Sequence, residues 1–198
     1  GSYRVRGLAL NNASDTNSDL PDHSNYYDQR FRLKITSAAG ETVKGVLWFE
    51  VGDMIWGDAA TGGNITADGK IVEVKNAYIE YKSDYGLFKL GIQPILLPKG
   101  IIVDDDVCAA MYMIKPMDEL TVVAGLLKGY DTTTSSTDKD MDGYVIMGLY
   151  DVSKELRVGG YFALADVNTK SIDYFGTAIP NDGADIYWLG LTSTGKFD

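Results

Sequence analysis

Cysteine and histidine are almost absent from this sequence. Its 198 residues include one cysteine, Cys108, and one histidine, His23. A single cysteine cannot build an internal disulfide framework, and the chain lacks the cluster of thiolates and imidazoles that a structural zinc site uses. We therefore expect a fold held by neither disulfides nor zinc, with Cys108 as a buried apolar side chain.

Positive charge and long apolar runs are also lacking. The formal net charge is -10, from 28 acidic and 18 basic residues, so the basic stripe that nucleic-acid binding needs is missing. No run of about 18 apolar residues occurs, which excludes a transmembrane helix. The strand-like segment YRVRGLAL follows Gly1 and Ser2 at once, so we expect no signal peptide in this chain, which is either cytosolic or already processed.

Helix signals are scarce, whereas residues typical of strands and turns are abundant. Tyr, Val, Ile and Thr recur throughout, and 22 glycines interrupt them, a composition that predicts an all-β chain. The expected strands are 3–11, 26–37, 42–56, 70–82, 86–96, 106–115, 119–130, 143–152, 155–167 and 184–194.

The connections between these strands alternate in length. Short ones read SAAGE, SDYG, KPMDE and SKE, and long polar ones lie between them, such as DTTTSSTDKDMD. In an antiparallel up-and-down meander, every second connection falls at the same end. Transmembrane β-barrels of the outer membrane have this asymmetry, because their periplasmic turns are short and their extracellular loops are long.

Apolar and polar residues alternate within the strands, which gives each strand two different faces. In 26–37, Tyr27, Phe31, Leu33 and Ile35 share one face, and Asp28, Arg30, Arg32 and Lys34 share the other. In a membrane barrel the apolar face contacts lipid and the charged face lines a water-filled lumen. A soluble ligand-binding barrel, apolar inside, gives the same period of two and stays open as an alternative.

Two further features favour the membrane barrel over the soluble one. The strands are long, and aromatic residues stand near strand ends, where girdles at the membrane interfaces would lie. These aromatic residues are Tyr26, Tyr27, Trp56, Tyr81, Tyr85, Tyr130, Tyr150 and Tyr187.

Several segments resemble one family. YRVRG, DQRFRLK, NAYIEYKS, LFKLGIQP and GIIVDDDV resemble outer-membrane porins of Gram-negative bacteria, especially those of anaerobic metal- and sulfate-reducing lineages. The resemblance implies a β-barrel in the outer membrane, in contact with lipid and lipopolysaccharide. It implies passive diffusion of small hydrophilic solutes and ions, without enzyme activity or a cofactor, and homotrimers are frequent among porins.

The chain departs from these porins in strand number and in its last residues. Such porins usually have about 16 strands and finish on an aromatic-ended strand, whereas this sequence shows ten and stops at GKFD. We expect residues 1–198 to form a single β-barrel domain that is incomplete at the C-terminus, the N-terminal part of a larger barrel. A complete ten-stranded barrel remains an alternative, because the strand number is even.

Charged residues on the polar faces are the candidate site. The expected pore-lining residues are Arg4, Arg6, Arg30, Arg32, Lys34, Glu50 and Glu80. A basic ladder that faces acids across the lumen would set ion preference, although these residues could also pair with one another to keep a polar wall satisfied. Asp104, Asp105 and Asp106 end a long connection that we expect to fold into the lumen as a constriction, the alternative being a solvated loop tip.

One acidic segment resembles half of a calcium-binding loop. In DKDMDG, Asp138, Asp140 and Asp142 occupy alternate positions before Gly143, but the twelfth position is Leu149 instead of the bidentate Glu. This excludes an EF-hand and leaves a calcium site of oxygen ligands in an extracellular loop, or a plain polar loop, as interpretations.

Two alternative functions stay open. Asp22, His23 and Ser24 are adjacent, a spacing that rarely gives triad geometry, so an outer-membrane barrel hydrolase is a weaker hypothesis. The segments AAMYMIK, TVVAGLLKG and YVIMGLY are apolar on both faces. They would suit a plugged section, a subunit contact, or a structural barrel that encloses or docks a partner such as an electron-transfer cytochrome.

Overall fold

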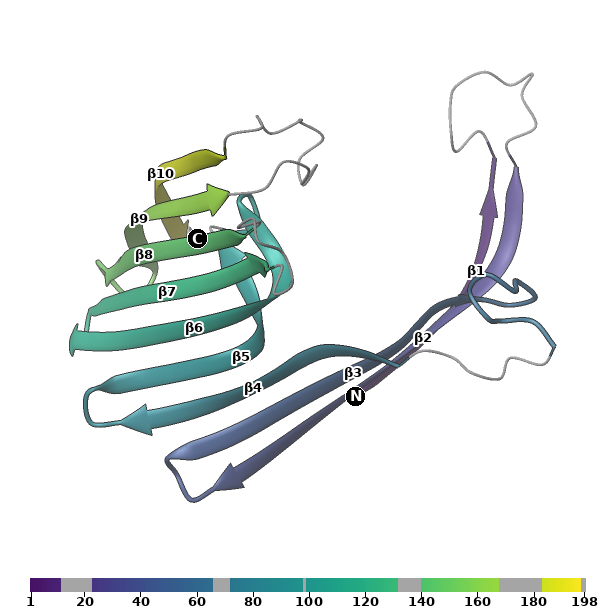
Figure 1. Ribbon diagram of the computed structural model, residues 1–198, viewed down its shortest axis with the longest axis horizontal. Helices are drawn as coiled ribbons and strands as arrows, with labels where there is room; N and C mark the ends of the chain where they lie inside the picture. The colour runs from purple at the N-terminus through teal and green to yellow at the C-terminus, as the bar shows by residue number, and fades with distance from the viewer. Residues whose placement is uncertain (12–22, 66–71, 98, 132–139, 168–182, 197–198) are drawn as a thin grey trace. The chain divides into compact units, whose positions relative to one another are not determined.

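The computed structural model of the protein is one antiparallel sheet of ten strands (Figure 1). It describes residues 1–11, 23–65, 72–97, 99–131, 140–167 and 183–196. The strands follow in chain order, each beside the next, and the sheet does not close. Their bounds are β1 Ser2–Leu10, β2 Ser24–Ala39, β3 Val43–Ile55, β4 Glu73–Ser83, β5 Gly86–Leu97, β6 Val103–Met117, β7 Leu120–Tyr130, β8 Met141–Asp151, β9 Leu156–Val167 and β10 Ala184–Gly195.

The structure confirms the all-β, up-and-down order and finds a strand at each of the ten expected places. No helix occurs among the described residues that has the length and apolarity to cross a bilayer. One expected connection is wrong: β5 and β6 extend toward each other until only residues 98–102 separate them. Asp104, Asp105 and Asp106 therefore lie at the start of β6, and the expected long loop is the bent end of a β-hairpin.

The described residues divide into two compact units. The first contains Gly1–Thr36 and Leu47–Lys75, and the second contains Ser37–Val46 and Asn76–Asp198. The first unit holds most of β1, β2 and β3, and the second holds most of β4 to β10.

In β2 the polar face is covered at Asp28 and half-covered at Arg30 and Arg32, whereas the apolar face is exposed. Asp28 is 3% exposed, whereas its neighbour Tyr27 is 58% exposed and Phe31 is 43% exposed. This is the reverse of a water-soluble sheet, in which the apolar face packs into the core. The alternation predicted the two faces of β2, and the burial distinguishes which of them is open.

In the second unit the sheet from β5 to β10 is strongly curved (Figure 1). Its convex face carries large apolar side chains that lie opposite one another in register from strand to strand. One row across β7 to β10 is Ala124, Ile146, Phe162 and Leu189, and the row beside it is Leu126, Tyr144, Leu164 and Tyr187. We call this surface the apolar belt.

A row of charged residues borders the apolar belt at the end where β7 connects to β8. Lys128 pairs in register with Asp142, Asp142 with Asp166, and Asp166 with Asp185. Directly opposite like charges destabilise a sheet, so this row needs a highly hydrated or cationic environment. The expectation that Cys108 is buried is wrong, because the thiol is exposed beside Lys128 in the same row.

The concave face of the same strands is also apolar, because the end of the β5–β6 hairpin packs against it. Ile95 and Leu97, near the end of the β5–β6 hairpin, form a buried cluster with Ala109, Val145 and Ala163. Burial of these side chains on the concave face explains why β6, β7 and β8 are apolar on both sides: one side is the apolar belt and the other packs against the hairpin.

Candidate functional site

A ladder of charged side chains crosses β1 and β2 in the first unit. Arg4 lies opposite Arg30, and Arg6 lies opposite Asp28, so all four share one face. Nε and Nη2 of Arg6 donate to the two oxygens of Asp28 at 3.0 and 2.5 Å. This bidentate pairing supplies the hydrogen bonds that the buried carboxylate needs, and it fixes the arginine in one orientation.

Asp53 of β3 joins the ladder, which the alternation in β3 did not predict. Nη2 of Arg4 donates to Oδ1 of Asp53 at 2.5 Å, and Nη1 of Arg30 lies 3.8 Å from Oδ2. Gly52, with φ of +146°, shifts the alternation by one residue, and a Cβ at this position would lie 2.8 Å from Cα of Arg30. A glycine inside a strand is the sequence signal for such an irregularity.

Arg32 and Lys34 extend the ladder along β2. Arg32 forms an ion pair with Glu50, which is 7% exposed. Both cations also stand over the ring of Trp48, at 5.7 and 5.6 Å from its centroid. These distances permit cation–π attraction, so Trp48 is a site residue that sequence reasoning missed.

Among the described residues of this ladder, cations outnumber acids. The cations are Arg4, Arg6, Arg30, Arg32 and Lys34, and the acids that pair with them are Asp28, Glu50 and Asp53, an excess of two positive charges within this set. The whole chain carries -10. A local positive excess within an acidic protein attracts small anions to this face.

Glu80 belongs to a separate ion pair in the second unit. It lies opposite Lys89 in the β4–β5 register, and Nζ of Lys89 is 3.0 Å from Oε1 of Glu80. The same ammonium stands 5.6 Å from the ring centroid of Tyr78. Glu80 is therefore paired within its own hairpin, the polar-wall arrangement considered above.

The three adjacent aspartates of β6 have different environments. Asp104 and Asp105 are exposed, whereas Asp106 accepts a hydrogen bond at 2.5 Å from Nδ2 of Asn76, which is 1% exposed. Oδ1 of Asp105 also accepts from the backbone N–H of Asp106 at 2.7 Å. These residues and the arginine ladder belong to different units, so their opposition across a lumen stays a prediction.

The calcium hypothesis concerns Asp138, which lies outside the described residues, and two aspartates that are described. Nζ of Lys128 lies 3.5 Å from Asp140, 2.8 Å from Asp142 and 3.6 Å from Asp131. The ammonium thus occupies the position that a cation would need between these carboxylates. Within the described ranges, no group of three or more acidic, histidine or cysteine side chains is arranged to hold a metal ion.

The adjacent residues behind the hydrolase hypothesis are described only in part. His23 and Ser24 are exposed, and Asp22 lies outside the described residues. The hypothesis remains untested.

Comparisons with known proteins do not assign the chain to a family. No family model matches the sequence, and a search of curated proteins gave no match.

Proposed function

We propose that the chain forms the wall of a β-barrel channel in the outer membrane of a Gram-negative bacterium. Small hydrophilic solutes and ions diffuse through its lumen passively. In this proposal the apolar belt contacts lipid and lipopolysaccharide, and the protein assembles as a homotrimer. The channel needs no enzyme activity and no cofactor.

The observation that carries the proposal is the reversal of polar and apolar burial. Asp28, Asn76 and Gln93 are between 1% and 3% exposed, whereas Leu90 is 66% and Ile146 is 53% exposed. In water, a contiguous apolar surface of this extent would drive aggregation or association. In a bilayer the same surface is solvated by lipid tails. The covered polar groups are satisfied inside the sheet, as Asp28 is by Arg6 and Gln93 by the carbonyl of Ala109.

The dimensions of the apolar belt also suit a bilayer. On β8 it runs from the charged row at Asp142 to Tyr150, within a strand of 11 residues. A tilted strand crosses the hydrocarbon region in about 9–11 residues. Tyr144 and Tyr187 lie beside the charged row, and Tyr150 lies at the opposite rim, where interface aromatics are enriched.

A membrane-spanning sheet also requires closure, because an unpaired edge in hydrocarbon costs several kcal/mol per unsatisfied group, by order of magnitude. The proposal therefore requires that the outer edges of β1 and β10 be paired in the membrane, with each other or with further strands. Cross-linking between cysteines introduced at Val5 of β1 and Leu189 of β10 tests direct closure of this chain by itself.

Single-channel conductance in planar lipid bilayers tests the channel. We expect the purified chain, reconstituted from detergent, to give discrete conductance steps in KCl. A structural barrel that encloses a partner would insert without conducting while the partner is bound. A correctly inserted chain that the Val5–Leu189 cross-link shows to be closed, and that gives no conductance steps without any partner, would refute the diffusion function.

Solubility separates the membrane barrel from a soluble ligand-binding barrel. We expect the folded chain to need detergent or lipid, and to aggregate when detergent is removed. A monodisperse, folded chain in plain buffer, with Ile146 and Leu90 open to water, would refute the membrane location.

A further inference from the structure

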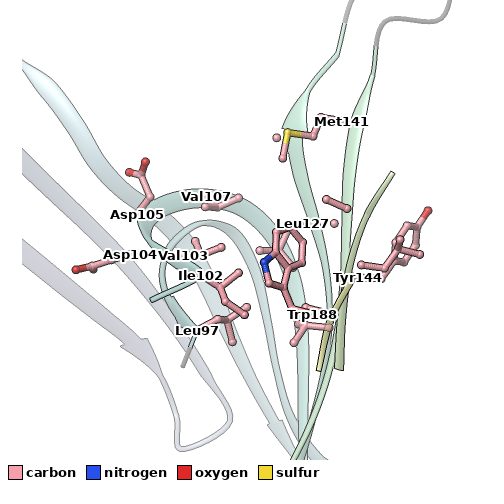
Figure 2. Close-up of a pocket in the computed structure, with 16 residues that line it drawn as sticks. Leu97, Ile102, Val103, Asp104, Asp105, Val107, Leu127, Met141, Tyr144 and Trp188 are labelled. Carbon is pink, nitrogen blue, oxygen red and sulfur yellow. The ribbon is translucent and has the colours of Figure 1, made fainter. Parts of the chain in front are cut away.

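A cavity lies between the β5–β6 hairpin and the concave face of β7 to β10 (Figure 2). Its volume is about 180 Å³. Leu97, Ile102 and Val103 of the hairpin form one wall, and Leu127 and Trp188 stand opposite them. All of these residues belong to the second unit, so the cavity is defined by that unit alone.

The size and lining of the cavity distinguish it from ordinary packing. Folded proteins leave few voids larger than a water molecule, because interior side chains interdigitate. The sheet side of the cavity is lined by small residues, because Gly143, Ala163 and Ala165 lie where larger side chains would fill the space. An enclosed apolar cavity of about 150 Å³ accepts a molecule of the size of benzene, and this pocket, which is partly open to solvent, has room for a ligand of that size.

Trp188 gives the cavity a polar group. Its indole ring points toward Ile102 and Val103 (Figure 2), and among the described residues its N–H has no hydrogen-bond partner. Asp104 and Asp105 stand at the rim and point away from the apolar residues. Their negative charge disfavours an anion nearby, and the apolar lining gives a cation no partner inside.

We propose that this cavity is a binding site for a small neutral aromatic molecule that carries one hydrogen-bond acceptor, such as an aromatic ketone. Its ring fills the apolar space between hairpin and sheet, and its acceptor takes the free N–H of Trp188. The ring of the ligand thus leaves water for apolar side chains, and its acceptor leaves water for an N–H donor.

The inference goes beyond the proposed channel and does not depend on it. It requires only the fold of β5 to β10 and the hairpin end, and a chain that conducts no ions could still bind the ligand. The test therefore measures ligand binding in the cavity itself, and it can be done in detergent micelles or in plain buffer.

Fluorescence titration with acetophenone tests the site. Trp188 becomes the only indole when the other two of the three tryptophans are replaced in the double variant Trp48→Phe/Trp56→Phe. We expect acetophenone to quench Trp188 emission along a saturable curve. Benzoate, which has the same ring with a negative charge, should give no saturable component.

Substitutions on the two faces of the sheet provide the matched controls. Ala163→Phe places a ring in the cavity and should weaken acetophenone binding by roughly tenfold or more, because the added volume takes the ligand's space. Ala124→Phe makes the same change on the convex face and should leave binding unaltered. Circular dichroism of each variant confirms that the sheet is retained.

A variant of the hairpin covers the case in which Ala163→Phe does not fold. Ile102→Ala enlarges the cavity without changing a strand, and it should allow saturable quenching by the larger ketone 2-acetonaphthone. Linear quenching by acetophenone in the parent would overturn the proposal, because it indicates partition into micelles or random collisions. Equal affinities in Ala163→Phe and Ala124→Phe would also overturn it.

Discussion

Placing a charge at the centre of the apolar belt gives the sharpest test of what this surface touches. Ile146 lies on β8, four residues from Asp142 and four from Tyr150. At about 3.3 Å per residue it is about 13 Å along the strand from either rim. The side chain is 53% exposed, so an arginine fits there without repacking the interior.

The expected free-energy cost depends on the solvent. At the middle of a bilayer, arginine on the lipid face of a barrel costs about 2–4 kcal/mol, whereas close to the interface it costs about 0–1 kcal/mol. We therefore expect Ile146→Arg to lower the free energy of unfolding by about 2–4 kcal/mol. Tyr144→Arg, beside the charged row, should lower it by about 1 kcal/mol or less.

Equilibrium unfolding in urea with phospholipid vesicles, followed by tryptophan fluorescence, measures both variants. The reasoning is refuted if both substitutions change stability by no more than about 0.5 kcal/mol, the usual effect of a change on a surface in water. Expression of either variant as a folded, detergent-free monomer would point the same way.

Three other predictions concern the ladder, the loop end and the backbone. Lys34→Glu should shift the reversal potential of the channel in a KCl gradient toward cation preference, since it removes one positive charge and adds a negative one on the ladder face; an unchanged potential would place Lys34 away from the ion path. Lys128→Met should make the melting temperature rise with calcium in the variant alone, because the ammonium no longer neutralises Asp140 and Asp142; a calcium response in the parent would show that the ammonium does not occupy a cation position. Gly52→Ala should destabilise by about 1–3 kcal/mol, because its φ is +146° and the new Cβ meets the β2 backbone, whereas Gly45→Ala, with open space around its position, should not.

The alternation of residues was sufficient to predict most of the sheet. It located every strand, and in β2 it separated Tyr27 and Phe31 from Asp28 and Arg30 correctly. This works because the side-chain period of a strand is two, whatever solvent each face meets. The same property prevented the alternation alone from distinguishing a membrane barrel from a soluble barrel, and strand length and the placing of aromatic residues favoured the former.

The sequence could not predict features that depend on backbone irregularity or on distant packing. Asp53 joins the ladder because of the shift at Gly52, and the alternation of residues 43–51 gives it the opposite face. Polar, Pro- and Gly-containing residues around 98–106 indicated a loop, yet strand pairing continues to Leu97 and Val103. The apolar concave faces of β6 to β8 are explained only once the hairpin is seen to pack on them.

The hairpin end also constrains the order in which the chain can assemble. All pairing between the described strands joins strands that are consecutive in the sequence, so each step of growth closes only the connection between two neighbours. The hairpin instead contacts the last strand: Nζ of Lys99 donates to the carbonyl of Ser193 at 2.6 Å, 94 residues away. A sheet that has formed only as far as β9 lacks this hydrogen bond, so the hairpin makes its last contact only after β10 has paired with β9.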